Sequence, residues 1–303
     1  MNVFITGGTG FIGTHLVKRL RERQDSVVLL TRRADAARER FGHDYRIVQG
    51  DPMAPGDWMD AVADCDAVIN LAGESIFGRR WNEDFKLLLR DSRVKTTEHV
   101  IEALARKPGR QKVLINASAI GYYGPLGDEV VAEDHLPGAD TLAHLCVEWE
   151  KAAQRAEPLG IRTVRMRIGV VLDKEGGALR QMLTPFKMFA GGPVGSGKQW
   201  MSWIHHADLV GLFLLALDNS GAHGPINGTA PNPVTNRQFA KALGRALHRP
   251  SFVPTPAFAL RLALGGAAGV VTTGQRVEPR QALALGYRFQ FPTLDEAFAD
   301  IFK

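Results

Sequence analysis

The sequence predicts an α/β protein built on a Rossmann-type, doubly wound parallel sheet, with a smaller C-terminal domain on the substrate side. Three observations lead to this prediction. An apolar strand at residues 2–6 of the 303-residue chain runs into a glycine-rich turn, and strands then alternate with helices through short connections. That alternation ends near residue 172, after which glycine and proline become frequent.

We therefore expect residues 1–172 to form a nucleotide-binding Rossmann domain, and residues 173–205 with 231–303 to form the smaller substrate-side domain. Residues 206–230 are expected to return to the first sheet as a helix followed by a strand. The predicted strands are 2–6, 26–31, 45–48, 67–71, 112–117, 162–166 and 224–228.

The glycine-rich turn has the spacing G-x-x-G-x-x-G, which is typical of dinucleotide sites. Such glycines allow a tight turn, a close approach of backbone to pyrophosphate, and packing of the next helix on the strand. The N-terminus of that helix offers free N–H groups to phosphate. An ordinary strand-turn-helix is the alternative, but the three elements occur in the required order. The residues expected to contact the cofactor here are Gly7, Thr9, Gly10, Phe11, Ile12 and Gly13.

Two arginines follow the second predicted strand. Arg32 and Arg33 occupy the place where an NAD-binding unit normally offers an acidic residue to the ribose 2′-hydroxyl. Arginine there favours a 2′-phosphate, so we expect NADP(H) to be preferred over NAD. The alternative is that one or both arginines are simply solvated at the strand end.

Composition restricts the class of partner. The net charge is +5, but the basic residues are scattered and are not interleaved with aromatic residues along one face. An anionic small molecule explains this mild excess, so we expect no nucleic-acid partner and a monomer or homodimer.

The cysteine count and hydropathy bear on location. Cys65 and Cys146 are too few for a disulfide framework, which fits a reducing cytoplasm. A signal peptide is not expected, because the first predicted strand begins at residue 2. The apolar stretch 256–272 is interrupted by Arg261 and three glycines, so no membrane span is expected either.

Two other motifs are set aside at this stage. Residues 192–198 satisfy G-x-x-x-x-G-K, but Gln199 stands where a magnesium-binding Ser or Thr belongs. His205, His206 and Asp208 suggest a metal, yet no other cluster supplies further ligands and Asp208 is placed to cap a helix. The sequence therefore predicts no metal site.

Several motifs occurring in order give the chain a family resemblance. It resembles the extended short-chain dehydrogenase/reductase superfamily, the class of nucleotide-sugar epimerases, at Thr6–Gly13, Asn70–Gly73, Ser118 with Tyr122–Gly124, and Trp203–Asp208. More narrowly, it is similar to an atypical "epimerase family protein" branch at Cys146–Glu150, Gly191–Gly197 and Gly274–Arg280.

The resemblance implies further site residues. It places Asp51 at the adenine, although a helix cap is an equally simple role for that residue. It places Arg167 near the nicotinamide end. It also makes Ser118 a candidate catalytic residue, next to the cofactor, whose hydroxyl bonds a substrate oxygen; the alternative is a buried serine with its hydrogen bonds satisfied. Residues whose backbone would lie along the cofactor are Leu71, Ala72, Gly73 and Glu74.

The catalytic Tyr-x-x-x-Lys pair of such enzymes is absent, because Leu142 and Cys146 stand at the matching positions. Tyr122, Tyr123 and Cys146 are the candidate catalytic replacements. Loop packing is the alternative for the tyrosines, and a buried structural role is the alternative for the cysteine.

A cation and aromatic surfaces suggest a pocket for an anionic or sugar-like ligand. Its candidate residues are Arg79, Lys198, Trp200 and Trp203. Two functional hypotheses stay open. One is an NADP(H)-dependent epimerase or reductase acting on a nucleotide-sugar or another small anionic carbonyl or hydroxyl compound. The other is a non-catalytic NADP-binding sensor or regulatory module.

Overall fold

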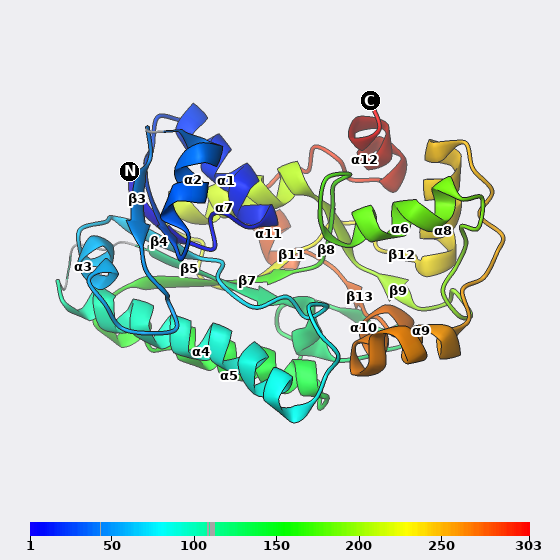
Figure 1. Cartoon of the computed structure of the whole chain (residues 1–303), viewed down its shortest axis with the longest axis horizontal. Helices are drawn as coiled ribbons and strands as arrows, with labels where there is room; N and C mark the ends of the chain where they lie inside the picture. Colours follow the sequence, from blue (N-terminus) through cyan, green and yellow to red (C-terminus); the bar gives the residue numbers. More distant parts are fainter. Residues whose placement is uncertain (43, 108, 110–112) are drawn as a thin grey trace.

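The computed structural model describes residues 1–42, 44–107, 109 and 113–303, and it confirms the predicted fold class. Residue 112, where one predicted strand begins, lies outside the described residues. A seven-stranded parallel sheet runs through the molecule (Figure 1). Its strands are β1 (Asn2–Thr6), β2 (Ser26–Thr31), β3 (Arg46–Gln49), β4 (Ala67–Asn70), β5 (Val113–Ala119), β7 (Arg162–Ile168) and β11 (Gly224–Gly228).

The strand order is β11-β7-β5-β4-β1-β2-β3, so the chain reverses direction across the sheet between β3 and β4. Helices cover both faces, as parallel crossovers require (Figure 1). One face carries α1 (Phe11–Glu22), α2 (Ala34–Phe41) and α7 (His206–Asp218). The other carries α3 (Trp58–Ala63), α4 (Glu83–Ala105) and α5 (Thr141–Gln154). No helix in the described part of the chain has the length and hydropathy to cross a bilayer.

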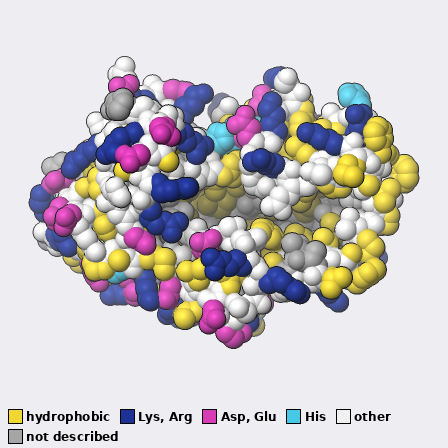
Figure 2. Space-filling model, viewed as in Figure 1, with side chains coloured by type: hydrophobic (Ala, Val, Ile, Leu, Met, Phe, Trp, Pro, Cys, Tyr) yellow, Lys and Arg dark blue, Asp and Glu magenta, His cyan; other side chains and the backbone are white. Residues whose placement is uncertain are grey.

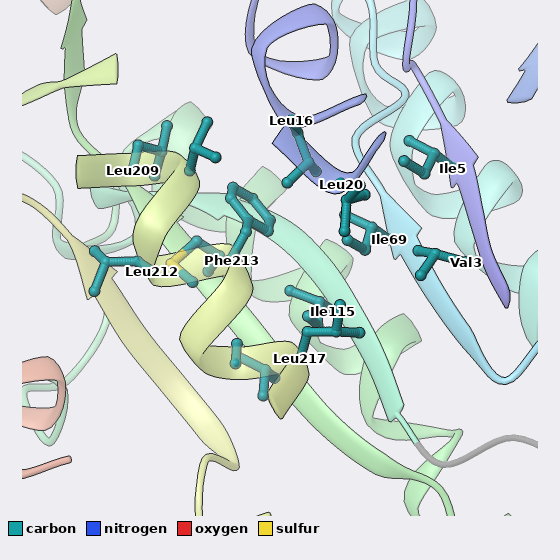
Figure 3. Close-up of a cluster of buried hydrophobic side chains, with 14 of the residues drawn as sticks. Val3, Ile5, Leu16, Leu20, Ile69, Ile115, Leu209, Leu212, Phe213 and Leu217 are labelled. Carbon is teal, nitrogen blue, oxygen red and sulfur yellow. The ribbon is translucent and has the colours of Figure 1, made fainter. Parts of the chain in front are cut away.

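The main core lies between the sheet and the pair α1 and α7 (Figure 3). Because side chains alternate along a strand, Val3 and Ile5 of β1 face this core, whereas Phe4 packs with Trp58 against the other face. The helices contribute Leu16, Leu20, Leu209, Leu212, Phe213 and Leu217.

A second hydrophobic cluster lies beyond the sheet, around the fully buried Trp203 and Phe239. It is built mainly from α6 (Gly177–Lys187), α8 (Asn236–Leu247) and α12 (Leu294–Ile301). Short strand pairs join this region: β8 (Val170–Leu172) with β10 (Trp203–His205), β9 (Trp200–Met201) with β12 (Val234–Thr235), and β6 (Val130–Val131) with β13 (Arg276–Val277). The remaining elements are η1 (Ile120–Tyr123), η2 (Glu157–Leu159), α9 (Ala257–Leu264), η3 (Gly265–Ala267), α10 (Ala268–Thr272) and α11 (Arg280–Ala284).

Asp208 has a different role from the predicted helix cap. The side chain of His205 caps α7 by accepting the N–H of Ala207. The buried carboxylate of Asp208 instead accepts backbone N–H groups of Gln290 and Phe291, at 2.8 and 2.9 Å, and the Tyr287 hydroxyl. Asp208 therefore fastens the segment before α12 to the helix that packs on the main sheet.

Replacing Asp208 by Asn should destabilise the protein by about 1–3 kcal/mol, because an amide group then faces at least one buried backbone donor. Asp218→Asn is the matched control at the exposed end of α7, where the carboxylate pairs with Arg23. That change should cost no more than about 1 kcal/mol. Urea unfolding of the two variants measures the difference, and equal stabilities would contradict this role for Asp208.

Candidate functional site

The glycine-rich turn between β1 and α1 packs directly on the peptide that follows β4. Gly7 has φ +68°, and a Cβ there would lie 2.7 Å from the carbonyl carbon of Leu71. A Cβ on Gly13 would lie 2.3 Å from the carbonyl oxygen of Gly7. Only glycine fits either position, and the contact sets residues 71–72 alongside the turn.

A buried polar network holds this arrangement. The Thr6 hydroxyl accepts the N–H groups of Leu71 and Ala72, at 3.2 and 3.1 Å, and donates to the side-chain oxygen of Asn70. The amide of Asn70 in turn donates to the Asn116 side chain at 2.7 Å. The carboxyl ends of β1, β4 and β5 are thereby joined, which is where ligands bind in open α/β sheets.

The first turn of α1 is free to receive an anion. Gly10 is the N-cap residue, its backbone is extended, and within the described ranges no side chain accepts the first N–H groups of the helix. The structure thus places the predicted residues Gly7 to Gly13 around one turn with outward donors. The ring of Phe11 packs against Gly176 and Gly177 at the start of α6.

Arg32 and Arg33 lie exposed just after β2, and no ion pair engages either of them in the described part of the chain. A third arginine, which the sequence analysis missed, comes close to the turn: Arg40 donates to the carbonyl oxygen of Thr9 at 2.9 Å. The sequence feature that could have identified Arg40 is its position on α2, the helix that follows Arg32 and Arg33. Asp51 is exposed, and its carboxylate accepts the N–H of Met53.

The segment from Leu71 to Glu74 is fixed at both ends. Thr6 holds its beginning, and α4 holds its end, since the N–H of Glu74 donates to the Ser92 hydroxyl at 3.0 Å. Arg93 donates to the carbonyl of Glu74 at 2.9 Å, and burial lowers the pKa of this arginine. The backbone predicted to run along a cofactor is therefore held from two sides.

Ser118 and Arg167 are both bonded to Glu150 of α5. The Ser118 hydroxyl donates to Oε1 of Glu150 at 2.7 Å, and Arg167 donates to both carboxylate oxygens at 2.8 and 2.9 Å. All three side chains are buried. Burial lowers the pKa of Arg167, but the bonds to Glu150 outweigh this and raise it overall.

This network gives both residues protein partners. The Ser118 hydroxyl donates to Glu150, and the Arg167 guanidinium donates to protein acceptors, because a buried charge needs a partner. The substrate and nicotinamide contacts expected of them stay predictions. Sequence analysis missed Glu150 as their common partner. The sequence feature that could have identified Glu150 is its spacing: it lies four residues after Cys146, and therefore on the same face of the helix.

The two candidate tyrosines differ in accessibility. Tyr123 is buried, donates to the Asn227 side chain at 2.7 Å and accepts from Arg167. Burial raises the pKa of Tyr123 to about 12, despite these bonds. Tyr122 is half-buried, and the Arg167 guanidinium lies 3.5 Å from its ring centre. Of the two, Tyr122 is the one with an accessible side chain.

Cys146 fits the alternative of a buried structural cysteine. Its side chain is buried, and burial, followed by the nearby charge of Glu150, raises its pKa to about 12. The thiol therefore stays protonated at neutral pH and is a poor nucleophile. Leu142 and Cys146 both lie against Gly121, so the positions matching the usual Tyr and Lys form an apolar contact.

The predicted substrate residues fall into two groups. Arg79 and Lys198 are exposed, and Trp200 is half-buried with its indole donating to Asp128 at 2.8 Å. Trp203 is fully buried and donates to the carbonyl of Asn232. This corrects the prediction for Trp203, whose side chain packs in the second core because the alternation along β10 turns it inward.

The loops that carry Arg79 and Lys198 contact a common segment. A Cβ on Gly266 would lie 3.1 Å from the Cβ of Trp81, and the Gln199 side chain donates to the carbonyl of Val271 at 3.2 Å. Figure 2 shows a hollow between the two halves of the molecule, with Lys and Arg side chains along its rim. Residues 265–274 thus connect the two loops on the substrate side.

Comparison with known proteins agrees with this geometry. Residues 3–227 match the model of the NAD dependent epimerase/dehydratase family, and residues 255–301 match a domain of unknown function, DUF1731. Over 307 aligned residues the chain is 43% identical to "Epimerase family protein SDR39U1 homolog, chloroplastic" of Arabidopsis thaliana, covering 100% of this chain and 87% of that protein.

Solved structures give the same result. The crystal structure of human epimerase family protein SDR39U1 (isoform2) with NADPH is similar, with a TM-score of 0.89 and 37% identity over 99% of each chain. UDP-glucuronic acid 4-epimerase from Bacillus cereus, in complex with UDP-glucuronic acid and NAD, has a TM-score of 0.79 at 17% identity, covering 100% of this chain and 99% of that chain. The second likeness is one of fold.

Glu150→Gln should destabilise the protein by about 3–5 kcal/mol, because it leaves the buried Arg167 without its counter-charge. Glu148→Gln is the matched control on the same helix. Glu148 pairs with Arg90 at the surface, so its loss should cost no more than about 1 kcal/mol. Denaturant titration compares the two variants, and a mild effect at position 150 would show that the buried pair contributes little.

Proposed function

Because the chain belongs to the NAD dependent epimerase/dehydratase family, we propose that it binds NADP(H) and acts as an oxidoreductase or epimerase on a small anionic carbonyl or hydroxyl compound, nucleotide-sugars included. The proposed preference for NADP(H) rests on Arg32 and Arg33 at the end of β2. Both side chains are exposed, and neither has an acidic partner in the described chain. NADPH in the human SDR39U1 structure supports it.

Each part of the cofactor has a proposed binding surface. The first N–H groups of α1 receive the pyrophosphate, and the backbone of residues 71–73 lies along the dinucleotide. Arg32 and Arg33 hold the ribose 2′-phosphate through charge-assisted hydrogen bonds, while Arg40 adds positive charge beside the turn. Asp51 is the proposed contact to adenine.

When bound, the nicotinamide supplies or accepts a hydride. The chain must then place a proton donor near the substrate oxygen. The buried thiol of Cys146 and the side chain of Leu142 cannot serve, and the Tyr123 hydroxyl is already bonded. We propose Tyr122, or water admitted beside it, as the proton source.

A second function is favoured by the same site. Leu142 and the protonated Cys146 replace a catalytic pair by an apolar contact, and the Ser118 hydroxyl is bonded to Glu150. A protein that binds NADP(H) without turnover, as a sensor or regulatory module, needs no proton donor. The nucleotide-binding turn would then be the whole of the functional site.

Location and assembly are further proposals. Cys65 and Cys146 are both buried and are too few for a disulfide framework, which fits a reducing compartment, and we propose the cytoplasm. The plant relative carries the description chloroplastic. We propose a monomer or homodimer with a small-molecule ligand.

Arg32→Ala and Arg33→Ala should each weaken NADPH binding by about tenfold or more, because each removes a charge-assisted hydrogen bond to phosphate. Affinity for NADH, which has no 2′-phosphate, should stay the same. Arg19→Ala, at an exposed arginine paired with Glu22 on α1, is the control. Fluorescence titration with both nucleotides measures the effect. Equal affinity of the unmodified protein for NADPH and NADH would refute the preference.

Incubating the protein with NADPH and a panel of carbonyl compounds and nucleotide-sugars should lower the nicotinamide absorbance for at least one substrate. Arg79→Ala and Lys198→Ala should raise the KM for an anionic substrate about tenfold or more, by removing a charge that binds it. Tight NADPH binding with no turnover on the panel would favour the sensor. Unchanged KM in both variants would remove these two cations from the pocket.

A further inference from the structure

Three potential metal ligands that are far apart in the sequence meet beside α1. His15 lies in the second turn of α1, Asp173 follows β8, and His206 is the first residue of α7. Nε2 of His15 is 3.0 Å from Oδ2 of Asp173, and Nδ1 of His206 is 3.2 Å from the same oxygen. The three ligand atoms all lie within 4.8 Å of one another.

We propose that His15, Asp173 and His206 bind a divalent transition-metal ion of the zinc class, with water completing its coordination. Two imidazole nitrogens and one carboxylate oxygen are a ligand set that suits such ions. In a tetrahedral zinc centre, bonds of about 2.0–2.1 Å place neighbouring ligand atoms about 3.3 Å apart. The two nitrogen–oxygen separations lie close to this value, and the two imidazole nitrogens lie within 4.8 Å of each other.

The carboxylate is oriented toward the imidazoles. Asp173 is 5% exposed, and its Oδ1 accepts the N–H of Glu175 at 2.7 Å. This bond fixes the carboxylate and leaves Oδ2 facing the two rings, which is the kind of support that orients metal ligands. The charge of Glu175 also acts on His15, so the surroundings of the cluster attract a cation.

The imidazole of His206 has an unmet bonding requirement. Its Nδ1 atom is buried but makes no hydrogen bond, even though Asp173 Oδ2 is near. Coordination to a metal would satisfy this atom. The side chains of His15 and His206 are 27% and 26% exposed, which leaves an open side for a water ligand.

Packing holds the rings in position. The ring of His206 is stacked on that of His15, with centroids 4.3 Å apart, and is tilted against that of His205, with centroids 4.4 Å apart. Burial lowers the pKa of His15, which favours the neutral form that binds metals. The competing arrangement is a pair of imidazoles that merely share one carboxylate, and that arrangement would bind no ion.

Sequence analysis missed this site because it grouped His206 with His205 and Asp208. The ring of His205 stays beside that of His206, but His205 caps α7 and Asp208 is bonded to the segment before α12. A metal ion here would join α1, the loop before α6, and α7. It would therefore stabilise the contact between the main sheet and the second core.

The test uses the full chain without a polyhistidine tag, first stripped with chelator. We expect dialysis against Zn²⁺ to leave one ion per chain by elemental analysis, and Co²⁺ to produce visible ligand-field absorption. The thermal unfolding midpoint should rise with Zn²⁺. His206→Gln and Asp173→Asn should each weaken Zn²⁺ binding about tenfold or more. His223→Gln, at an exposed histidine elsewhere, should leave binding unchanged.

Three results would overturn the proposal: no stoichiometric ion, no Co²⁺ absorption, or His206→Gln binding Zn²⁺ as tightly as the unmodified chain. If Asp173→Asn does not fold, the partly exposed His206 still decides the question through His206→Gln. Circular dichroism verifies that this variant is folded. None of these measurements depends on turnover, so the outcome is independent of the proposed function.

Discussion

The contact between the glycine-rich turn and the end of β4 is the constraint on which the rest of the site depends. Gly7 leaves no room for a side chain against Leu71, and the Thr6 hydroxyl holds the N–H groups of residues 71 and 72. With two strand ends fixed at this distance, α1 follows its N-cap residue Gly10, and no side chain among the described residues accepts its first N–H groups. This one packing contact therefore produces both an anion site and a backbone segment along which a dinucleotide can lie.

Next to residues 71–72, the centre of the molecule is built around the buried charges of Glu150 and Arg167 and not around a proton donor. Glu150 accepts hydrogen bonds from the Ser118 hydroxyl and from two nitrogens of the Arg167 guanidinium, and Arg167 also contacts Tyr123. A buried ion pair of this kind is weak evidence for added stability, but removing one partner is costly. The network fixes α5 against β5 and β7 while occupying hydroxyls that a catalyst would use. This is why the site supports nucleotide binding more firmly than any particular reaction.

Much of the fold could be predicted from the residues. Strands 2–6, 26–31 and 224–228 are observed with the predicted bounds. For the first two, an apolar run between turns indicates burial on both faces of a parallel sheet. The family resemblance is confirmed as well. The predicted strand 162–166 is observed as β7 and extends to Ile168. After Gly169 the chain continues as β8, which belongs to a different sheet. A Cβ on Gly169 would lie 2.4 Å from the Ser202 carbonyl oxygen, a contact invisible in the local pattern.

The sequence by itself determined the sheet, the glycine-rich turn and the arginines at the end of β2, because each depends on residues close together in the chain. Only the tertiary structure decided the partners of Ser118, the burial of Cys146 and Trp203, the anchoring role of Asp208 and the meeting of His15 with His206. These depend on pairs separated by tens to nearly two hundred residues. Hydrogen bonding and desolvation act through space, so side-chain chemistry is set by neighbours that no local pattern identifies.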